Sequence, residues 1–255
     1  LPAAVCYNPA DRTFWRNETM KRDCVLAIDL GTTGNRAILY GKDGRVLSSA
    51  YREFRQYYPK PGWVEHDAEE IWRSALGVVG GALARARIDP SRIAGIGLTN
   101  QRETTVLWDR DTSRPVGRAI VWQDRRTADI CERLRKRGCE GAFRRKTGLV
   151  LDPYFSGTKI RWLLERDSAL AARARRGKVL FGTVESWILW KLTGGRVHAT
   201  DMTNASRTLL LDIRTASWDG ELMRMLSVPR AMLPEVFDCG GFFGETAAVG
   251  ALGRG

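Results

Sequence analysis

The hydrophobic and polar pattern near the start of the chain predicts three strands. An apolar run over residues 24–30 ends in the polar turn GTTGN, which is typical of a buried strand that leads into a tight loop. Strand character resumes with RAILYG, KDG at residues 42–44 predicts a hairpin turn, and RVLSSAYREF alternates as a third strand does. We therefore expect the domain to open with a three-stranded antiparallel meander.

The segment YYPKPGWVEHD is too rich in proline and glycine for regular structure, and it leads into the clearest helix of the sequence. Asp67 is a favourable N-cap, and Glu70 follows three residues later, as a capping box requires. Apolar residues then recur with helical spacing, namely Ile71, Ala75, Val78, Val79 and Leu83. The pattern predicts an amphipathic helix that begins next to Asp67.

Further along the chain, strands alternate with helices. IAGIGLTN from Ile93, TTVLWD, and AIVWQD from Ala119 have the composition of strands, and each apolar run ends in polar residues. Helical periodicity dominates residues 125–137, recurs around Trp162, and continues through VESWILWKL. No repeat or linker divides residues 20–250, so the pattern indicates one α/β domain with a mixed sheet and flanking helices.

Composition excludes several classes of protein. With 44% hydrophobic and 27% charged residues, the 255-residue chain has the composition of a soluble globular protein with a sizeable core. No apolar run approaches the roughly 18 residues of a membrane helix, so no membrane insertion is expected. Five scattered cysteines and only two histidines, His66 and His198, argue against a disulfide framework, a zinc centre or a histidine-based triad. Both histidines are interpreted as structural or surface residues.

The net charge of +12 raises the question of a nucleic-acid partner. The densest basic stretches, at residues 133–137, 144–146 and 173–178, fall where amphipathic helices should expose a solvated face. No aromatic residues interleave with them as stacking platforms. We predict that nucleic acid is not a partner.

Residues 1–19 do not begin with Met, show no periodicity and lack the apolar segment of a signal peptide. We expect this leader to be disordered or non-native.

The turn after the first strand has the composition of a phosphate loop. Gly31 and Gly34 would let backbone amides approach phosphate oxygens, and Thr32 and Thr33 would donate hydroxyl groups. Asp29 would face a magnesium ion, through water because magnesium dehydrates reluctantly. An ordinary strand-to-strand turn explains these residues equally well. Neither the P-loop motif nor the G-x-G-x-x-G fingerprint occurs in the sequence.

Polar clusters follow three apolar runs, and each could line a cleft at the end of a sheet. In TNQRETT at residues 99–105, Arg102 offers several donors and Glu103 offers acceptors, which suits the hydroxyls of a small polyol. WQDRR contributes Trp122, for which a core position and a pocket position are equally favoured. DPYFSGTK at residues 152–159 contributes the hydroxyl of Tyr154. An isolated Arg-Glu pair would indicate a surface salt bridge, but three such clusters favour a site.

These motifs resemble those of the glycerol kinases, members of a sugar and polyol kinase family that shares the fold of actin and hexokinase. The resemblance extends from about Val25 to Leu233, through DLGTTGNRA, YPKPGWVEHD, TNQRETT, IVWQDRRTA, TGLVLDPYFSGTK, LFGTVESW and GRVHATDMTNASRT. It implies an actin-like, ribonuclease H-like ATPase domain. It also implies ATP- and magnesium-dependent phosphorylation of glycerol to sn-glycerol 3-phosphate, in a cytoplasmic enzyme whose family members are homo-oligomeric.

The resemblance also suggests roles for individual residues. By position, four look like contacts to glycerol: Arg102, Glu103 and Tyr154 as hydrogen-bonding groups and Trp122 packed beside the carbons. Four others look like contacts to the nucleotide and its phosphates: Thr32, Thr33, Gly34 and Arg36. Asp29 looks like the acid near the magnesium ion.

The sequence departs from the family in one important place. The family's catalytic Asp lies in a Gly-Asp-Gln loop, and no Gly-Asp-Gln occurs in the chain. The resemblance therefore predicts that residues 20–255 are the N-terminal domain of a glycerol kinase, without the C-terminal ATP-binding domain and weak or inactive alone. Milder departures are Gly34 and Asn35, where serines are common, and Leu30, where Gln is frequent.

Two other functions remain open. One is a kinase of the same family that acts on a pentulose or a longer polyol. The other is a non-catalytic binding module with an actin-like fold.

Overall fold

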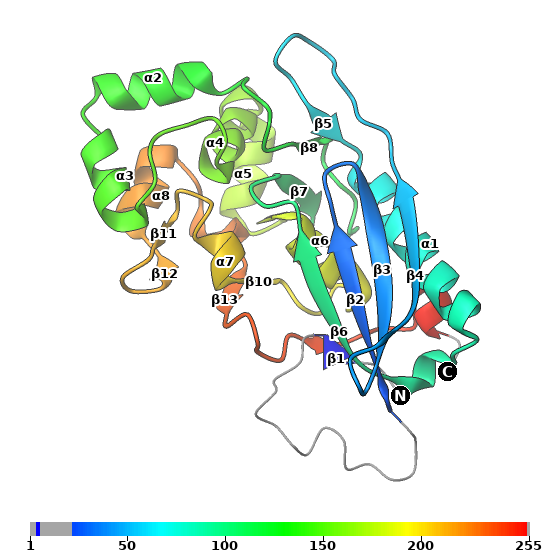
Figure 1. The fold of residues 1–255 in the computed structure, drawn as a ribbon. Helices are drawn as coiled ribbons and strands as arrows, with labels where there is room; N and C mark the ends of the chain where they lie inside the picture. The colour runs from blue at the N-terminus through cyan, green and yellow to red at the C-terminus, as the bar shows by residue number, and fades with distance from the viewer. Residues whose placement is uncertain (1–3, 6–21, 254–255) are drawn as a thin grey trace.

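A six-stranded mixed sheet forms the centre of the computed structural model, which describes residues 4–5 and 22–253 (Figure 1). The strand order is β14-β1-β6-β2-β3-β4. The antiparallel strands β2, β3 and β4 confirm the predicted meander, and β6 runs parallel to β2. The bounds are β1 (Ala4–Val5), β2 (Cys24–Leu30), β3 (Gly34–Gly41), β4 (Val46–Glu53), β6 (Ile93–Asn100) and β14 (Gly244–Glu245).

The disordered or non-native leader stays a prediction, but two of its residues lie in the described part of the chain. Ala4 and Val5 form β1, which pairs with β6 and β14. Backbone groups at the open edge of β6 favour any extended segment that can supply a hydrogen-bonded partner. The remainder of residues 1–19 lies outside the described residues.

Helix α1 (Ala68–Ala86) covers one face of the meander and contacts β3 and β4 (Figure 1). Asp67 is its N-cap, as predicted, and accepts hydrogen bonds from the amides of Glu69 and Glu70. The carboxylate of Glu70 accepts a hydrogen bond from Tyr57. The predicted apolar stripe is buried, so packing against the sheet stabilises this helix.

Helix α6 (Val184–Leu192) joins the same core, because Trp187 packs against Trp108 with ring centroids 5.4 Å apart. The indole Nε1 of Trp187 donates a hydrogen bond to the carbonyl of Ala68, the first residue of α1. Trp108 belongs to β7 (Val106–Asp109), which pairs with β9 (Val179–Gly182). The indole N–H of Trp187 therefore connects α6 to the start of α1.

A second apolar core lies under the helices beside the sheet (Figure 1). Its helices are α2 (Ala128–Lys136), α3 (Glu140–Thr147), α4 (Ser156–Arg166), α5 (Ser168–Arg175) and α8 (Gly220–Leu226). A further short helix is α7 (Met202–Ala205). Short strands complete the fold: β5 (Glu65–His66), β8 (Ala119–Ile120), β10 (Ala199–Asp201), β11 (Leu211–Asp212), β12 (Ser217–Trp218) and β13 (Glu235–Phe237). Three 3-10 turns span Pro90–Arg92, Arg230–Met232 and Gly250–Gly253.

The predicted strand AIVWQD is shorter than expected, since β8 ends at Ile120. The chain then turns, and buried Asp124 accepts hydrogen bonds from the amide of Val64 and from the side chain of Arg126. Arg126 also pairs with Glu65 at 2.9 Å. Residues of this buried ion-pair network stand where the strand was predicted to continue, and α2 begins only at Ala128.

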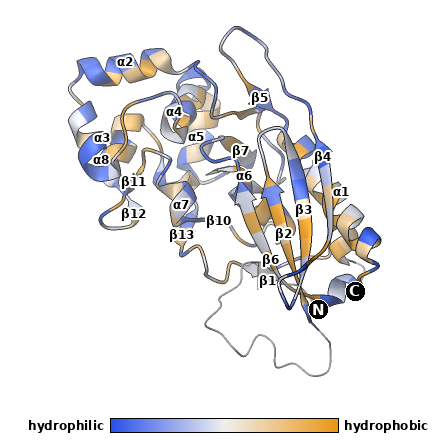
Figure 2. Cartoon of the chain, in the orientation of Figure 1, coloured by the Kyte–Doolittle hydropathy of each residue, from blue (hydrophilic) through white to orange (hydrophobic). Residues whose placement is uncertain are grey.

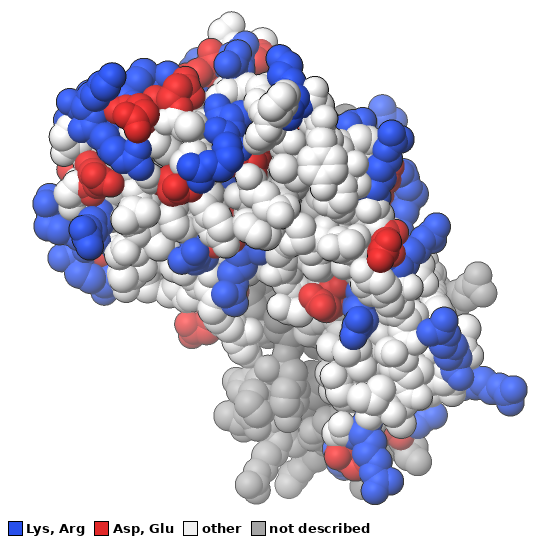
Figure 3. Space-filling model, turned by 45° about the horizontal axis from the view of Figure 1, so that its top comes forward, with Lys and Arg blue, Asp and Glu red and all other residues white. Residues whose placement is uncertain are grey.

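Basic residues lie on the exposed sides of α2 and α3, where acidic residues accompany them (Figure 3). Arg133, for example, pairs with Asp129 and Glu165. Helix α2 shows alternating hydrophilic and hydrophobic bands (Figure 2). Within residues 4–5 and 22–253, no helix is long and apolar enough to cross a membrane.

Substituting Gly182→Ala should destabilise the protein. A Cβ atom there would lie 2.5 Å from Cβ of Ser186 and 2.9 Å from Cη2 of Trp108. We expect a loss of roughly 1–3 kcal/mol in the free energy of unfolding, because overpacked cores must shift backbone or rotamers. Gly97→Ala in β6 is the matched control, since nothing lies within 4 Å of its added Cβ. Urea denaturation measures both, and equal midpoints for the two variants would contradict the expectation.

Candidate active site

The glycine–threonine loop, residues 31–33, connects β2 to β3 at one end of the sheet. Asp29 lies two residues before the loop on β2, with its side chain exposed, and pairs in register with Arg36 on β3 and Thr99 on β6. Thr33 is exposed and Thr32 is half-buried. The exposed carboxylate and hydroxyl are therefore within reach of a ligand at this end of the sheet.

Close packing against β4 requires a glycine at position 34. A Cβ atom there would lie 2.6 Å from the carbonyl oxygen of Arg52 and 2.8 Å from the hydroxyl of Tyr51, both on β4. Arg36 is exposed, and its guanidinium lies 5.4 Å from the ring centre of Tyr51. The absence of a side chain at Gly34 lets β4 pack closely against the start of β3, directly behind the loop.

Glu103 occupies a strained turn. Its φ is 62°, and the turn is closed by a hydrogen bond of 2.8 Å from the amide of Thr104 to the carbonyl of Arg102. This pattern is a three-residue turn with positive φ at its centre, a conformation that costs energy for a residue with a Cβ atom. The hydroxyl of Ser156, at the start of α4, donates to the carbonyl of Glu103 at 3.0 Å and helps to hold the turn. The buried carboxylate is thereby aimed in a fixed direction.

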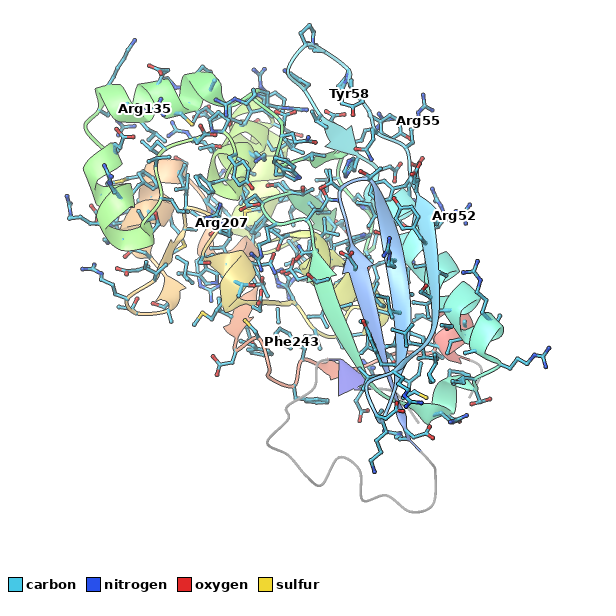
Figure 4. The ribbon with its side chains drawn as sticks, viewed as in Figure 1. Arg52, Arg55, Tyr58, Arg135, Arg207 and Phe243 are labelled. Carbon is cyan, nitrogen blue, oxygen red and sulfur yellow. The ribbon has the colours of Figure 1, made fainter. Side chains whose placement is uncertain are left out.

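Arg207 is the partner of Glu103, which is only 3% exposed. Nε of Arg207 donates to Oε1 of Glu103 at 2.6 Å, and the guanidinium lies over the rings of Phe155 at 4.9 Å and Tyr154 at 5.7 Å. Arg207 follows α7 and lies where the helices meet the end of the sheet (Figure 4). No local sequence pattern points to Arg207, because its partner lies in a turn 104 residues earlier.

Trp122 connects the two sides of the site. Its ring lies 5.5 Å from that of Tyr154, and its Nε1 donates to the hydroxyl of Thr32 at 3.0 Å. Both aromatic rings are half-buried. The structure therefore brings Glu103, Trp122 and Tyr154 together with Thr32 of the glycine–threonine loop.

Arg102 is separated from this group. Its side chain is exposed and lines a cavity of about 180 Å³, together with residues from β6, α6 and α7. Neither Glu103, Trp122 nor Tyr154 lines that cavity. The positive φ of Glu103 turns the chain at this point. The side chains of Arg102 and Glu103, although adjacent in the sequence, therefore lie in different spaces.

Lys159 holds the turn that carries Tyr154. It is fully buried, and its Nζ donates to the carbonyl of Pro153 at 2.8 Å and to that of Tyr154. Burial lowers the pKa of Lys159 to about 7, although the carboxylates of Asp124 and Glu103 oppose the shift. Lys159 belongs to the DPYFSGTK cluster, but its role in holding the turn is not evident from the sequence.

A magnesium ion would need ligands from outside the protein. Within the described part of the chain, no group of three or more His, Cys, Asp or Glu side chains could hold a metal ion. Asp29 offers a single exposed carboxylate next to the hydroxyls of the glycine–threonine loop. This donor set fits an ion that arrives with phosphate oxygens and keeps several waters.

Comparison with known proteins places the chain among sugar kinases. A sequence model of the N-terminal domain of the FGGY family of carbohydrate kinases matches residues 24–255. The glycerol kinase of Thermus brockianus is 59% identical over 222 residues, 87% of this chain and 45% of that protein. The glycerol kinase of Agrobacterium fabrum is 57% identical, over 87% of this chain and 44% of that protein. The chain thus spans about 45% of the length of these relatives.

Solved structures show the same fold. The structure of Plasmodium falciparum glycerol kinase with ADP matches 84% of this chain and 42% of its own, with 32% identity and a TM-score of 0.78. Gluconate kinase from Lactobacillus acidophilus matches 90% of this chain and 45% of its own, with a TM-score of 0.80. At 24% identity, the gluconate kinase shows a shared fold alone.

Replacing Lys159 with Met should remove a pH-dependent part of the stability. The folded-state pKa of about 7 lies below the ordinary value of 10.5, so between these pH values the unfolded chain binds more protons. Stability from this group therefore rises with pH in that window, by at most about 1.4 kcal/mol per pH unit.

The measurement is urea denaturation from pH 7 to pH 10, with the unaltered protein compared to Lys159→Met. Lys178→Met is the control, because Lys178 is exposed and forms a surface ion pair with Asp111. Parallel stability curves for the unaltered protein and Lys159→Met would show that Lys159 does not titrate in this way.

Proposed function

The chain belongs to the FGGY family of carbohydrate kinases, and from this premise we propose that its site binds glycerol for ATP-dependent phosphorylation to sn-glycerol 3-phosphate. Relatives named glycerol kinase are 52–59% identical to it, which supports glycerol, and not a sugar, as the substrate. Because the chain spans about 45% of those relatives, the activity of the whole enzyme is part of the proposal.

One observation carries the proposal: the buried carboxylate of Glu103 and the aromatic pair Trp122 and Tyr154 meet beside Thr32. Each glycerol hydroxyl donates one hydrogen bond and accepts others, so a polyol pocket needs a fixed acceptor and a donor. Oε1 of Glu103 is engaged by Arg207, which leaves Oε2 to accept from glycerol. The Tyr154 hydroxyl supplies the donor, and the Trp122 ring packs against the carbons.

The glycine–threonine loop would receive the phosphates. Phosphoryl transfer depends mainly on positioning and charge stabilisation. Backbone amides around Gly34 and the hydroxyls of Thr32 and Thr33 would bind phosphate oxygens, and Arg36 would add positive charge. A bound magnesium ion, near Asp29 through water, would neutralise the phosphate charge.

The described residues are proposed to bind and orient, and none is assigned the role of general base. Glu103 is held by Arg207 at 2.6 Å, which suits a hydrogen-bond acceptor for a ground-state hydroxyl. Arg102 is proposed as a further contact to a glycerol hydroxyl, for which its exposed side chain would have to move out of the neighbouring cavity that it lines. We further propose that residues 20–255 are the N-terminal domain of a cytoplasmic, homo-oligomeric kinase.

Glu103→Gln should weaken glycerol binding by about 10- to 100-fold, because a hydrogen bond to a charged acceptor is replaced by one to a neutral amide. Isothermal titration calorimetry with the full chain measures the affinity. Glu235→Gln is the matched control, since Glu235 is an exposed carboxylate on β13. Unchanged glycerol affinity in Glu103→Gln would remove Glu103 from the proposed site.

The same titration with ribitol and xylulose tests the alternatives. Stronger binding of either than of glycerol would favour a kinase for longer substrates. If the unaltered chain binds none of the three, the result would favour a non-catalytic binding module.

A further inference from the structure

A row of three side chains, half-buried Gln56 and buried His66 and Gln101, lies between the two sides of the proposed site. Nε2 of His66 is 2.5 Å from Oε1 of Gln56, and Nδ1 is 3.3 Å from Nε2 of Gln101. His66 is 0% exposed and Gln101 is 6% exposed. None of the three is among the proposed ligand contacts, so the row is not explained by binding alone.

One side of the row holds the glycine–threonine loop. Nε2 of Gln56 donates to the carbonyl of Thr32 at 3.0 Å, and Nε2 of Gln101 donates to the carbonyl of Gly31 at 3.1 Å. Two side-chain amides from different parts of the chain therefore bind successive carbonyls of the loop.

The other side of the row reaches the turn of Glu103. Oε1 of Gln101 accepts a hydrogen bond from the hydroxyl of Thr104 at 2.9 Å. The same hydroxyl accepts one from the amide of Trp122 at 3.3 Å. Gln101 thus contacts the glycine–threonine loop with its nitrogen and the substrate side with its oxygen.

The hydrogen bonds run in one consistent direction. Nε2 of Gln101 donates to Gly31 and Oε1 accepts from Thr104, so Nδ1 of His66 must accept the second N–H of Gln101. The imidazole proton is then on Nε2 and is donated to Gln56, whose own amide nitrogen donates to Thr32. Only neutral imidazole in this tautomer satisfies every group in the row.

We propose that His66 is a positioning residue, which through Gln56 and Gln101 sets the glycine–threonine loop in register with the turn of Glu103. The proposal rests on the proposed function, in which these two segments hold the phosphates and the glycerol. Transfer between two bound groups requires the reacting atoms to lie about 3–3.5 Å apart, so a small shift between the segments is costly. His66 lies on β5, which is beyond the ends of β2 and β3 (Figure 1). It is therefore suited to connect the glycine–threonine loop to the turn of Glu103.

Acidic pH should loosen this arrangement. Burial lowers the pKa of His66 to about 4, below the ordinary value of 6.5, so the free energy of unfolding decreases as pH falls from 6.5 to 4. In the folded chain the imidazole itself takes up a proton only near pH 4. A proton on Nδ1 would face the N–H of Gln101. The surrounding groups do not stabilise it: the uncharged ring of Phe54 packs 5.0 Å away, Glu65 pairs with Arg126, and Asp67 caps α1.

The first test compares glycerol binding by the full chain carrying His66→Phe, His66→Gln or His198→Phe. We expect about a tenfold or greater loss for His66→Phe, which fills the space without hydrogen bonds, and recovery in His66→Gln, whose amide both donates and accepts. His198 is the matched control, because burial also lowers its pKa to about 4 while its Nε2 bonds Phe181, away from the row. Glycerol affinity should fall as pH drops through about 4, where His66 of the folded chain takes up a proton, and this dependence should be lost in His66→Gln.

The second test is hydrogen exchange, which needs no ligand and so separates this proposal from the proposed function. His66→Phe should speed amide exchange in residues 31–35 and 101–105 together, and His198→Phe should leave both unchanged. Faster exchange in one segment alone, or in neither, would overturn the proposal whatever the chain binds. If exchange rises in both segments but no variant binds glycerol, the positioning role holds and the proposed substrate fails.

Discussion

The architecture of the site depends on a buried carboxylate that must have a partner. Glu103 is almost fully enclosed at the centre of a strained turn, and an unpaired charge there would be very costly. Arg207 meets that requirement and, through the same guanidinium, covers the rings of Tyr154 and Phe155. One ion pair thereby fixes the positions of three segments that are far apart in the sequence.

Around this ion pair, side chains divide into those that we propose as ligand contacts and those that hold the loops. Thr32, Trp122 and Tyr154 belong to the first group by their exposure and contacts, and Lys159 and His66 belong to the second. Burial lowers the pKa values of Lys159 and His66, which favours the neutral form of each side chain. A perturbed pKa in this protein therefore identifies structural support as readily as it identifies chemistry.

Local patterns predicted much of the fold. The meander and the helix after Asp67 follow from short-range alternation and capping, and both are present. The strand predicted after Ala119 ends early because Asp124 and Arg126 form a buried ion-pair network with Glu65, far away in the chain. Arg102 and Glu103 looked like a pair in the sequence, yet a positive φ between them sends their side chains to different spaces.

The sequence by itself determined the α/β character, the glycine–threonine loop and the types of residue that could bind a polyol, since these depend on neighbours within a few positions. Only the tertiary structure decided that Arg207 is the partner of Glu103 and that His66 lies between two glutamine amides. Those contacts join residues that are 10 to 104 positions apart. Periodicity and propensity carry no information at that range, because side chains so far apart in the sequence meet only after the chain has folded.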